Sequence, residues 1–222
     1  MICGVVSASG GGGGSPYPDS LAVADFITSD YWIGDASTTA ELMIDRPDLI
    51  TASGLFIDWN AVAGATNCIG AFLTLLLTSN WTLVIEVTET DSGSMYPFYM
   101  RDVAGGSDAT YINTGDTNVA AYDQPAPGAD RSVNVSSVAA RPAVRRIAMT
   151  RTNTKHVMSV NGSAINSDVT STSTPSHDTV TLGGDPSTTN SSGVVASMYG
   201  YIRRVILYSP QTDAALPGLS TV

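Results

Sequence analysis

Lysine and glutamate are nearly missing from this 222-residue chain, which has one lysine, Lys155, and three glutamates, Glu41, Glu86 and Glu89. These charged residues favour helices, so their scarcity argues against a helical protein. Threonine, serine, valine, glycine and tyrosine are plentiful and are typical of strands and turns. Hydrophobic residues make up 43% of the chain, which is enough for a sizeable core and excludes wholesale disorder.

Basic residues are also few, and the formal net charge is −10. Proteins that bind nucleic acid carry a basic surface, and so do proteins that dock on anionic membranes. The composition therefore predicts neither partner. Nine of the ten cations are arginines, and four are close in sequence: Arg141, Arg145, Arg146 and Arg151. They could form a local basic face, or they could pair with the many aspartates, as surface charges usually do.

The two cysteines, Cys3 and Cys68, are too few for a disulfide framework. We expect two free thiols in a reducing compartment, with a single bridge that anchors the N-terminal region as the alternative. The start, MICGVVSASGGGGGSP, lacks a basic region followed by an apolar core. No secretory signal is therefore expected.

An uninterrupted hydrophobic run long enough for a membrane helix is lacking. The longest apolar stretch, residues 68–87, is broken by polar residues at 78–80 and carries Glu86 near its end. Two buried strands joined by a turn at 78–80 explain it better than a spanning helix. The sequence therefore predicts no insertion into a membrane.

The chain divides into three parts. Residues 1–20 form a glycine-rich arm with five consecutive glycines at 10–14, either a disordered tail or an arm that orders against a neighbouring subunit. Residues 21–60 are expected to hold short strands and to serve attachment or oligomerisation. Residues 61–222 carry the clearest strand patterns and predict a β-sandwich domain.

Within the third part, apolar strands are predicted at 69–77 and 81–89. Another follows at 96–103, where Pro97 indicates an edge strand. Residues 104–132 are rich in Gly, Asp and Pro, so a loop with one short strand at 109–113 is expected there.

The last third of the chain is the most regular. Strands are predicted at 145–152, 156–162, 178–184 and 197–209. Asn161 and Gly162 form a dipeptide typical of a type I′ hairpin turn, and a terminal helical turn capped by Thr212 follows the last strand. Short strands at this spacing predict an all-β fold, an antiparallel two-sheet jelly-roll sandwich.

Three segments in this order, RRIAMTRTNTKHVMSVNG, VTLGGD and GYIRRVILYSPQTDAAL, resemble the concanavalin A-like, laminin-G-like jelly-roll family. The matching positions are the hairpin residues Asn161 and Gly162, the last-strand residues Gly200, Ile202, Val205 and Tyr208, and the segment 213–216. The resemblance spans roughly residues 69–220 and implies a fold more than a function. The glycine-rich start and the scarce lysines are similar to versions of the family on tailed-bacteriophage virions.

Some relatives with this fold cut glycans with two facing carboxyl groups. The nearest pattern here is EVTETD at 86–91, in which Glu89 and Asp91 share a strand face and Glu86 points the other way. His156 and His177 are expected at the surface and form no recognisable triad or zinc motif. We therefore predict a protein that is not an enzyme and has no catalytic residues.

Two kinds of binding residue remain. The resemblance implies a possible Ca²⁺ site at a loop rim, although loop aspartates more often form turns. Exposed tyrosines in or near loops could stack on sugars, although packing in the core or at a subunit interface is the alternative. The calcium candidates are Asp102, Asp108, Asp116 and Asp185, and the sugar candidates are Tyr96, Tyr99, Tyr111 and Tyr122.

The leading functional hypothesis is a bacteriophage virion structural protein: a capsid decoration, head-fibre or tail-associated subunit. It would be assembled in the host cytoplasm, contact other virion proteins and form a homo-oligomer. The alternative is a carbohydrate-binding module that recognises host surface glycans.

Overall fold

The computed structural model describes residues 15–58, 66–68, 74–76, 80–90, 94–102, 108–125, 130–173, 177–189 and 195–222. The glycine-rich run at 10–14 and Cys3 lie outside these residues, and so do the predictions that concern them. Cys68 is buried and free.

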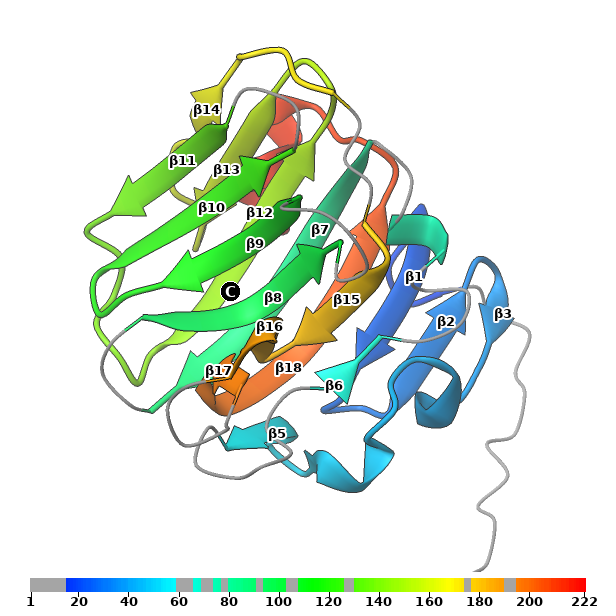
Figure 1. Ribbon diagram of the computed structural model, residues 1–222. Coiled ribbons are helices and arrows are strands. Elements are labelled where there is room, and N and C mark those ends of the chain that lie inside the picture. Colours follow the sequence, from blue (N-terminus) through cyan, green and yellow to red (C-terminus); the bar gives the residue numbers. More distant parts are fainter. Residues whose placement is uncertain are drawn as a thin grey trace, which may run out of the picture.

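Two antiparallel sheets face each other (Figure 1). The ten-stranded sheet has the order β14-β13-β12-β7-β18-β1-β2-β3, and β5 joins β18 and β4. Its strands are β1 (Ser20–Asp25), β2 (Asp30–Ile33), β3 (Ala36–Ser37), β4 (Ile50–Thr51), β5 (Gly54–Asp58), β7 (Trp81–Glu89), β12 (Val144–Arg151), β13 (His156–Val160), β14 (Asn166–Asp168) and β18 (Tyr199–Tyr208).

The six-stranded sheet has the order β11-β10-β9-β8-β15-β6. Its strands are β6 (Thr66–Asn67), β8 (Met95–Arg101), β9 (Ala109–Thr114), β10 (Asn118–Gln124), β11 (Arg131–Ser136) and β15 (Thr179–Leu182). A separate hairpin joins β16 (Gly184–Thr189) to β17 (Val195–Ser197). Short helical turns complete the fold: η1 (Ala40–Leu42), η2 (Pro47–Leu49), η3 (Asp213–Ala215) and α2 (Leu216–Leu219). The predicted two-sheet jelly-roll sandwich is confirmed.

The main core fills the space between the sheets. Alternate residues of β7, Leu83, Ile85 and Val87, point inward and are fully buried. Trp81 meets Phe98 of the opposite sheet with ring centroids 6.1 Å apart. Each such side chain contributes about 1.5–3 kcal/mol when it leaves water, so this layer holds the two sheets together.

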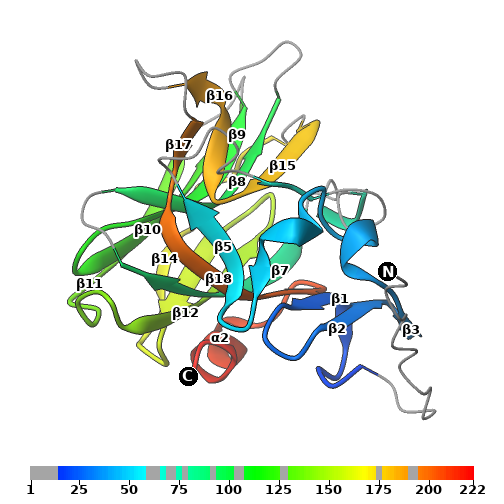
Figure 2. The same cartoon turned by 90° about the horizontal axis from the view of Figure 1, so that it is seen from below.

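A smaller apolar cluster lies on the outer face of the ten-stranded sheet. Val84, Ala148 and Ile206 are buried there beneath Leu216 of α2. Figure 2 shows α2 against the outside of this sheet. The terminal helical turn predicted from the sequence is present, but Thr212 makes no side-chain cap hydrogen bond, so that part of the prediction is wrong.

Several strand predictions are confirmed and others are not. β12, β13, β15 and β18 lie where predicted, and Asn161 and Gly162 have the positive φ angles, 49° and 72°, of a type I′ turn. The strand predicted at 69–77 is wrong where it can be judged, because residues 74–76 are helical. None of the helices in the described ranges is long and apolar enough to cross a bilayer.

The short strand predicted at 109–113 is confirmed as β9, but the loop predicted for the rest of 104–132 is wrong, because β10 and the start of β11 lie there. Pro97 does not mark an edge either, since β8 is paired on both sides, with β9 and β15. It occupies a register shift between Met95 and Phe98, where a residue without an N–H group can be accommodated. Its carbonyl oxygen still accepts a bond from the Gly183 N–H, at 3.0 Å.

Residues 21–60 supply strands to the same sheet as the C-terminal strands. β1 pairs with β18, and Phe56 of β5 lies opposite Tyr201. The attachment role predicted for this segment stays a prediction.

We predict that Gly200→Ala destabilises the fold by about 2–4 kcal/mol. Gly200 has φ +150°, and an added Cβ would overlap the Thr88 carbonyl oxygen and lie 2.9 Å from the Glu89 Cα. Urea unfolding of the two variants would measure the effect. The control is Gly218→Ala, whose Cβ would meet nothing within 4 Å and should change stability by less than about 0.5 kcal/mol. Equal stability of the two variants would contradict this account.

Candidate functional site

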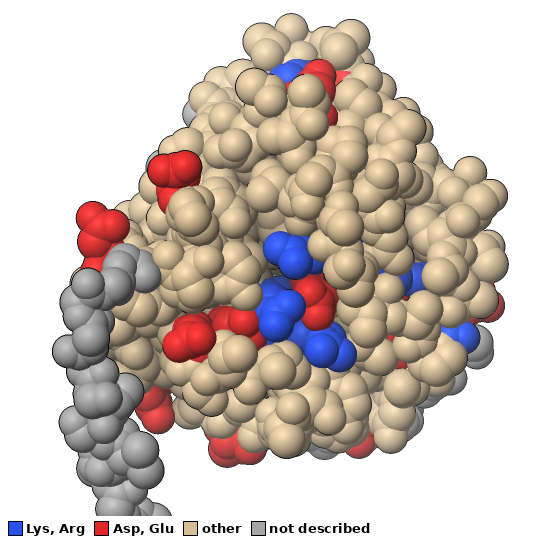
Figure 3. Space-filling view, turned by 180° about the vertical axis from the view of Figure 1, so that it is seen from behind, with Lys and Arg blue, Asp and Glu red and all other residues tan. Residues whose placement is uncertain are grey.

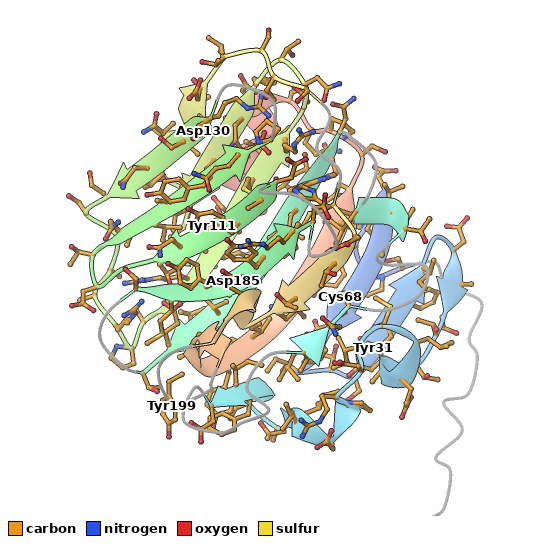
Figure 4. All side chains as sticks on the ribbon, in the orientation of Figure 1. Tyr31, Cys68, Tyr111, Asp130, Asp185 and Tyr199 are labelled. Carbon is orange, nitrogen blue, oxygen red and sulfur yellow. The ribbon has the colours of Figure 1, made fainter. Side chains whose placement is uncertain are left out.

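The four tyrosines singled out in the sequence meet on the outer face of the six-stranded sheet. Tyr96 and Tyr99 belong to β8, Tyr111 to β9 and Tyr122 to β10. The registers place Tyr111 directly between Tyr99 and Tyr122. All four therefore lie on strands rather than in loops, as one group that we call the tyrosine ladder. Figure 4 labels Tyr111 near its middle.

The rings of the ladder stand upright on the sheet. Tyr99 and Tyr111 stack with centroids 4.8 Å apart and an interplanar angle of 3°, and Tyr111 and Tyr122 stack at 4.8 Å and 21°. That separation matches the spacing between neighbouring strands, so the ring planes run along the strands. Tyr96 meets Tyr99 and Tyr111 edge-on, at 5.9 and 5.7 Å.

This arrangement determines which parts of the rings a ligand could reach. Both faces of Tyr111 are covered by its stacked neighbours. Beyond Tyr122 the next residue in register is the small, exposed Ser132 of β11. The ladder can therefore offer its edges and hydroxyl groups along its length, and a ring face for stacking at Tyr122.

Burial and nearby negative charge keep two of the ladder hydroxyls, those of Tyr99 and Tyr111, protonated. Burial raises the pKa of Tyr111 to about 12, and Tyr122, Tyr96, Asp130 and Asp185 add to the shift. The pKa of Tyr99 is raised too, first by burial and then by Asp185. Figure 4 shows Asp130 and Asp185 on the same side of the molecule as Tyr111. At neutral pH these two hydroxyls can thus both donate and accept hydrogen bonds.

The four aspartates proposed as calcium ligands are not brought together. Asp108 and Asp116 flank opposite ends of β9. Asp116 pairs with Arg141 at 3.2 Å, and Asp185 lies 3.7 Å from Arg101. Asp102 lies near Asp108, because the backbone N–H of Asp102 donates to the backbone carbonyl oxygen of Asp108 at 3.2 Å. Within the described ranges no group of three or more His, Cys, Asp or Glu residues could hold a metal ion.

The carboxylates of β7 point to opposite sides of the sheet, as the strand period predicts. Glu89 lies between the sheets, with Oε2 at 3.1 Å from Arg141 Nε and 3.3 Å from Arg145 Nη1. Glu86 lies outside, at 2.8 Å from Arg203 and 3.1 Å from Arg204. These two groups cannot face each other across a glycosidic bond. Asp91, the third acid of the pattern, lies outside the described residues.

Sequence reasoning missed a buried ionic group that we call the Asp123 cluster. Asp123, fully buried, accepts bonds from Arg131 Nε at 3.1 Å, Arg151 Nε at 3.2 Å and Thr110 Oγ1 at 2.7 Å. The charges of Asp123 and Arg131 make the segments of β10 and β11 look like loop in the sequence. A signal did exist, since Arg131 alternates in phase with the apolar Val133 and Val135.

His156 lies beside the Asp123 cluster and not at the surface, so its predicted exposure is wrong. Its side chain is fully buried, and neither ring nitrogen has a hydrogen-bond partner. Burial lowers its pKa to about 4, and the nearby charges of Asp123, Arg131, Arg151 and Asp168 act in opposing directions. The imidazole is therefore neutral in the folded protein at neutral pH.

No protein-family model matches the sequence, and a search of curated proteins gives no match. Solved structures do match. A Trypanosoma rangeli sialidase in complex with sialic acid has a TM-score of 0.60 and 14% identity, and the match covers 99% of this chain and 35% of that chain. The NanB sialidase from Streptococcus pneumoniae has a TM-score of 0.51 and 17% identity, and the match covers 67% of this chain and 25% of that chain.

The binding domain of botulinum neurotoxin serotype C1 is similar as well, with a TM-score of 0.50, 13% identity, and coverage of 71% of this chain and 40% of that chain. At these identities the likeness is one of fold. The chain spans between 25% and 40% of the length of these three proteins. They support the two-sheet β-sandwich fold.

We predict that stability falls as the pH drops from 6.5 towards 4, in part because of His156. In the unfolded chain the pKa of this histidine is 6.5, whereas in the folded protein its pKa is about 4. The unfolded state binds more protons in this window. The free energy of unfolding should therefore fall by about 2 kcal/mol between pH 7.5 and pH 5. Urea unfolding across this range would measure it.

His156→Leu should flatten that pH dependence. His177→Gln tests the other histidine, whose pKa is also lowered to about 4, first by burial and then by Arg151. Because His177 is only half-buried and solvent screens its charge, this variant should flatten the dependence less than His156→Leu does. The same slope in wild type and His156→Leu would rule out His156 as the cause.

Proposed function

We propose that this protein is a non-enzymatic carbohydrate-binding module whose ligand rests on the tyrosine ladder. The observation that carries the proposal is the gathering of four tyrosines from three neighbouring strands on one partly exposed sheet face. Aromatic residues in such a group combine apolar surface with polar hydroxyl tips, which suits the alternating C–H and O–H groups of a sugar.

The geometry of the ladder suggests how a saccharide binds. Tyr122 offers a ring face towards β11, on which one sugar ring can stack. The hydroxyl groups of Tyr111 and Tyr99 then hydrogen-bond to neighbouring sugar hydroxyls. Asn113 and Asn134, on the same outer face of β9 and β11, add further amide donors and acceptors.

The charges around the ladder favour a neutral saccharide. Asp130 and Asp185 both act electrostatically on Tyr111, and the whole chain carries a net charge of −10. An anionic sugar would meet like charge on approach, which selects against it. The sialic acid in the sialidase structure belongs to that protein, and the similarity in fold does not transfer the ligand.

We predict that neutral oligosaccharides on a glycan array bind the protein and that Tyr111→Phe weakens this binding about three- to tenfold, because one hydrogen bond is lost. Tyr122→Ala should weaken it further by removing the stacking face. Calorimetry with the best neutral ligand from the array gives the affinities.

The control is Tyr201→Phe, which removes a hydroxyl from a half-buried tyrosine in the ten-stranded sheet. A flat array, or equal affinities for wild type and Tyr122→Ala, would reject the ladder as the binding face.

A structural role in a tailed-bacteriophage virion is a second proposal. It rests on the resemblance of the last third of the chain and on the glycine-rich start. As a capsid decoration, head-fibre or tail-associated subunit, the protein would present its β-sandwich on the outside of the particle. Its N-terminal segments would contact other virion proteins. A carbohydrate-binding face suits such a position.

We predict that mass spectrometry of purified phage particles detects this chain and that light scattering shows a homo-oligomer in solution. Deletion of residues 1–20 should lower the oligomer mass if the arm orders against a neighbouring subunit. Absence from the particles would remove the virion role and leave the ladder proposal intact.

A further inference from the structure

The outer face of the ten-stranded sheet carries a row of alternating charge. The registers place Arg146 of β12 beside Glu86 of β7, Glu86 beside Arg204 of β18, and Arg204 beside Asp25 of β1. Arg203 joins the row at the register shift in β18. Figure 3 shows basic and acidic side chains gathered near the middle of this face. The row holds three guanidinium groups and two carboxylates.

Both carboxylates of the row are already engaged. Arg204 donates from Nε to Asp25 at 2.7 Å and from Nη1 to Glu86 at 3.1 Å. Arg203 Nε lies 2.8 Å from the other Glu86 oxygen, and Tyr17 donates to Asp25 at 2.8 Å. Glu86 is thus shared by two arginines on the β18 side, and neither carboxylate of the row forms an ion pair with Arg146.

Arg146 is the unpaired charge of the row. It stands opposite Glu86 in register, yet no ion pair joins them. Its Nε is buried and has no hydrogen-bond partner in the described part of the chain; the same holds for Arg203 Nε, which nevertheless lies 2.8 Å from Glu86. Burial raises the pKa of the Tyr17 and Tyr208 hydroxyls, the charge of Arg146 acts to lower it, and Asp25 and Asp19 respectively act in the opposite direction to Arg146. A charged donor left unsatisfied is costly, and an oxyanion that accepts from the guanidinium would relieve the cost.

Aromatic rings share this face. Phe56 lies 5.8 Å from Tyr199 and 5.1 Å from Tyr201, measured between ring centroids, and all three are half-buried. Tyr201 stands beside Thr88, and Thr88 beside Val144, two residues before Arg146. On this face Tyr201 is thus two strands and two residues away from Arg146, about 12 Å between backbones, a span that suits two linked sugar units rather than one.

We infer that this face holds a second ligand site, centred on Arg146, that takes the carboxylate of an acidic saccharide. The planar guanidinium matches a carboxylate through paired N–H donors, and the rings of Tyr201 and Phe56 lie on the same face where the next sugar unit of a longer saccharide would pass. The site lies on the opposite sheet from the tyrosine ladder and is independent of it. The two faces have contrasting charge preferences, one for neutral and one for acidic saccharides.

The test is a heteronuclear NMR titration of the full chain with D-glucuronate, D-glucose and sodium sulfate. Glucuronate should shift amide signals of β12, β7 and β18, and Arg146→Gln should weaken this binding at least about tenfold. Arg46→Gln is the matched control, since it removes one positive charge from an exposed pair with Asp48. It should leave glucuronate affinity unchanged.

Each other outcome counts against the inference. Equal glucuronate affinity of Arg146→Gln and wild type would overturn the site, provided that thermal melting shows the variant to be folded. If Arg146→Gln does not fold, Arg146→Lys is used instead, because it keeps the positive charge and lacks the planar guanidinium. This variant should still lower the glucuronate affinity, and unchanged binding would overturn the site. Equal affinity for sulfate and glucuronate, or shifts caused equally by glucose, would overturn the acidic-saccharide assignment.

Discussion

Two buried ionic groups hold the sheets of this sandwich in fixed register. At one end of the interior Asp123 of the six-stranded sheet binds Arg151 of the ten-stranded sheet, at 3.2 Å. At the other end Glu89 binds Arg145 at 3.3 Å, and Arg145 Nη1 donates to the Gly115 carbonyl at 2.6 Å. Buried charge is expensive unless every partner is in place. A shifted register would leave these charges unpaired, so the clusters select one arrangement of strands.

The alignment of the tyrosine ladder depends on that register. Side chains alternate along a strand, so a slip of one residue in β9 would turn Tyr111 into the core and Ile112 outwards. Thr110 and Thr114, at the two ends of β9, bind Asp123 and Glu89 respectively. The two ionic groups therefore fix the strand that carries the central ring of the ladder. The pairing of the buried charges and the alignment of the ladder rings thus both follow from the same strand register.

The two outer faces of the sandwich differ in chemistry although both come from antiparallel strands. The six-stranded sheet presents stacked phenol rings with Asp130 and Asp185 nearby. The ten-stranded sheet presents a charged row with one arginine in excess, next to the apolar cluster under α2. Although the whole protein has a net charge of −10, this row has a net positive charge, because it holds three arginines and only two carboxylates.

The sequence by itself determined the all-β class, the late strands and the turn at Asn161 and Gly162, because strand period and turn chemistry are local properties. It also singled out the four tyrosines as a candidate group, but not their alignment. Only the tertiary structure decided that they stack, that Asp102, Asp108, Asp116 and Asp185 do not converge, and that His156 is buried. The cross-strand register and the ion-pair partner of each arginine depend on contacts between segments that are far apart in the chain. No local sequence pattern contains that information.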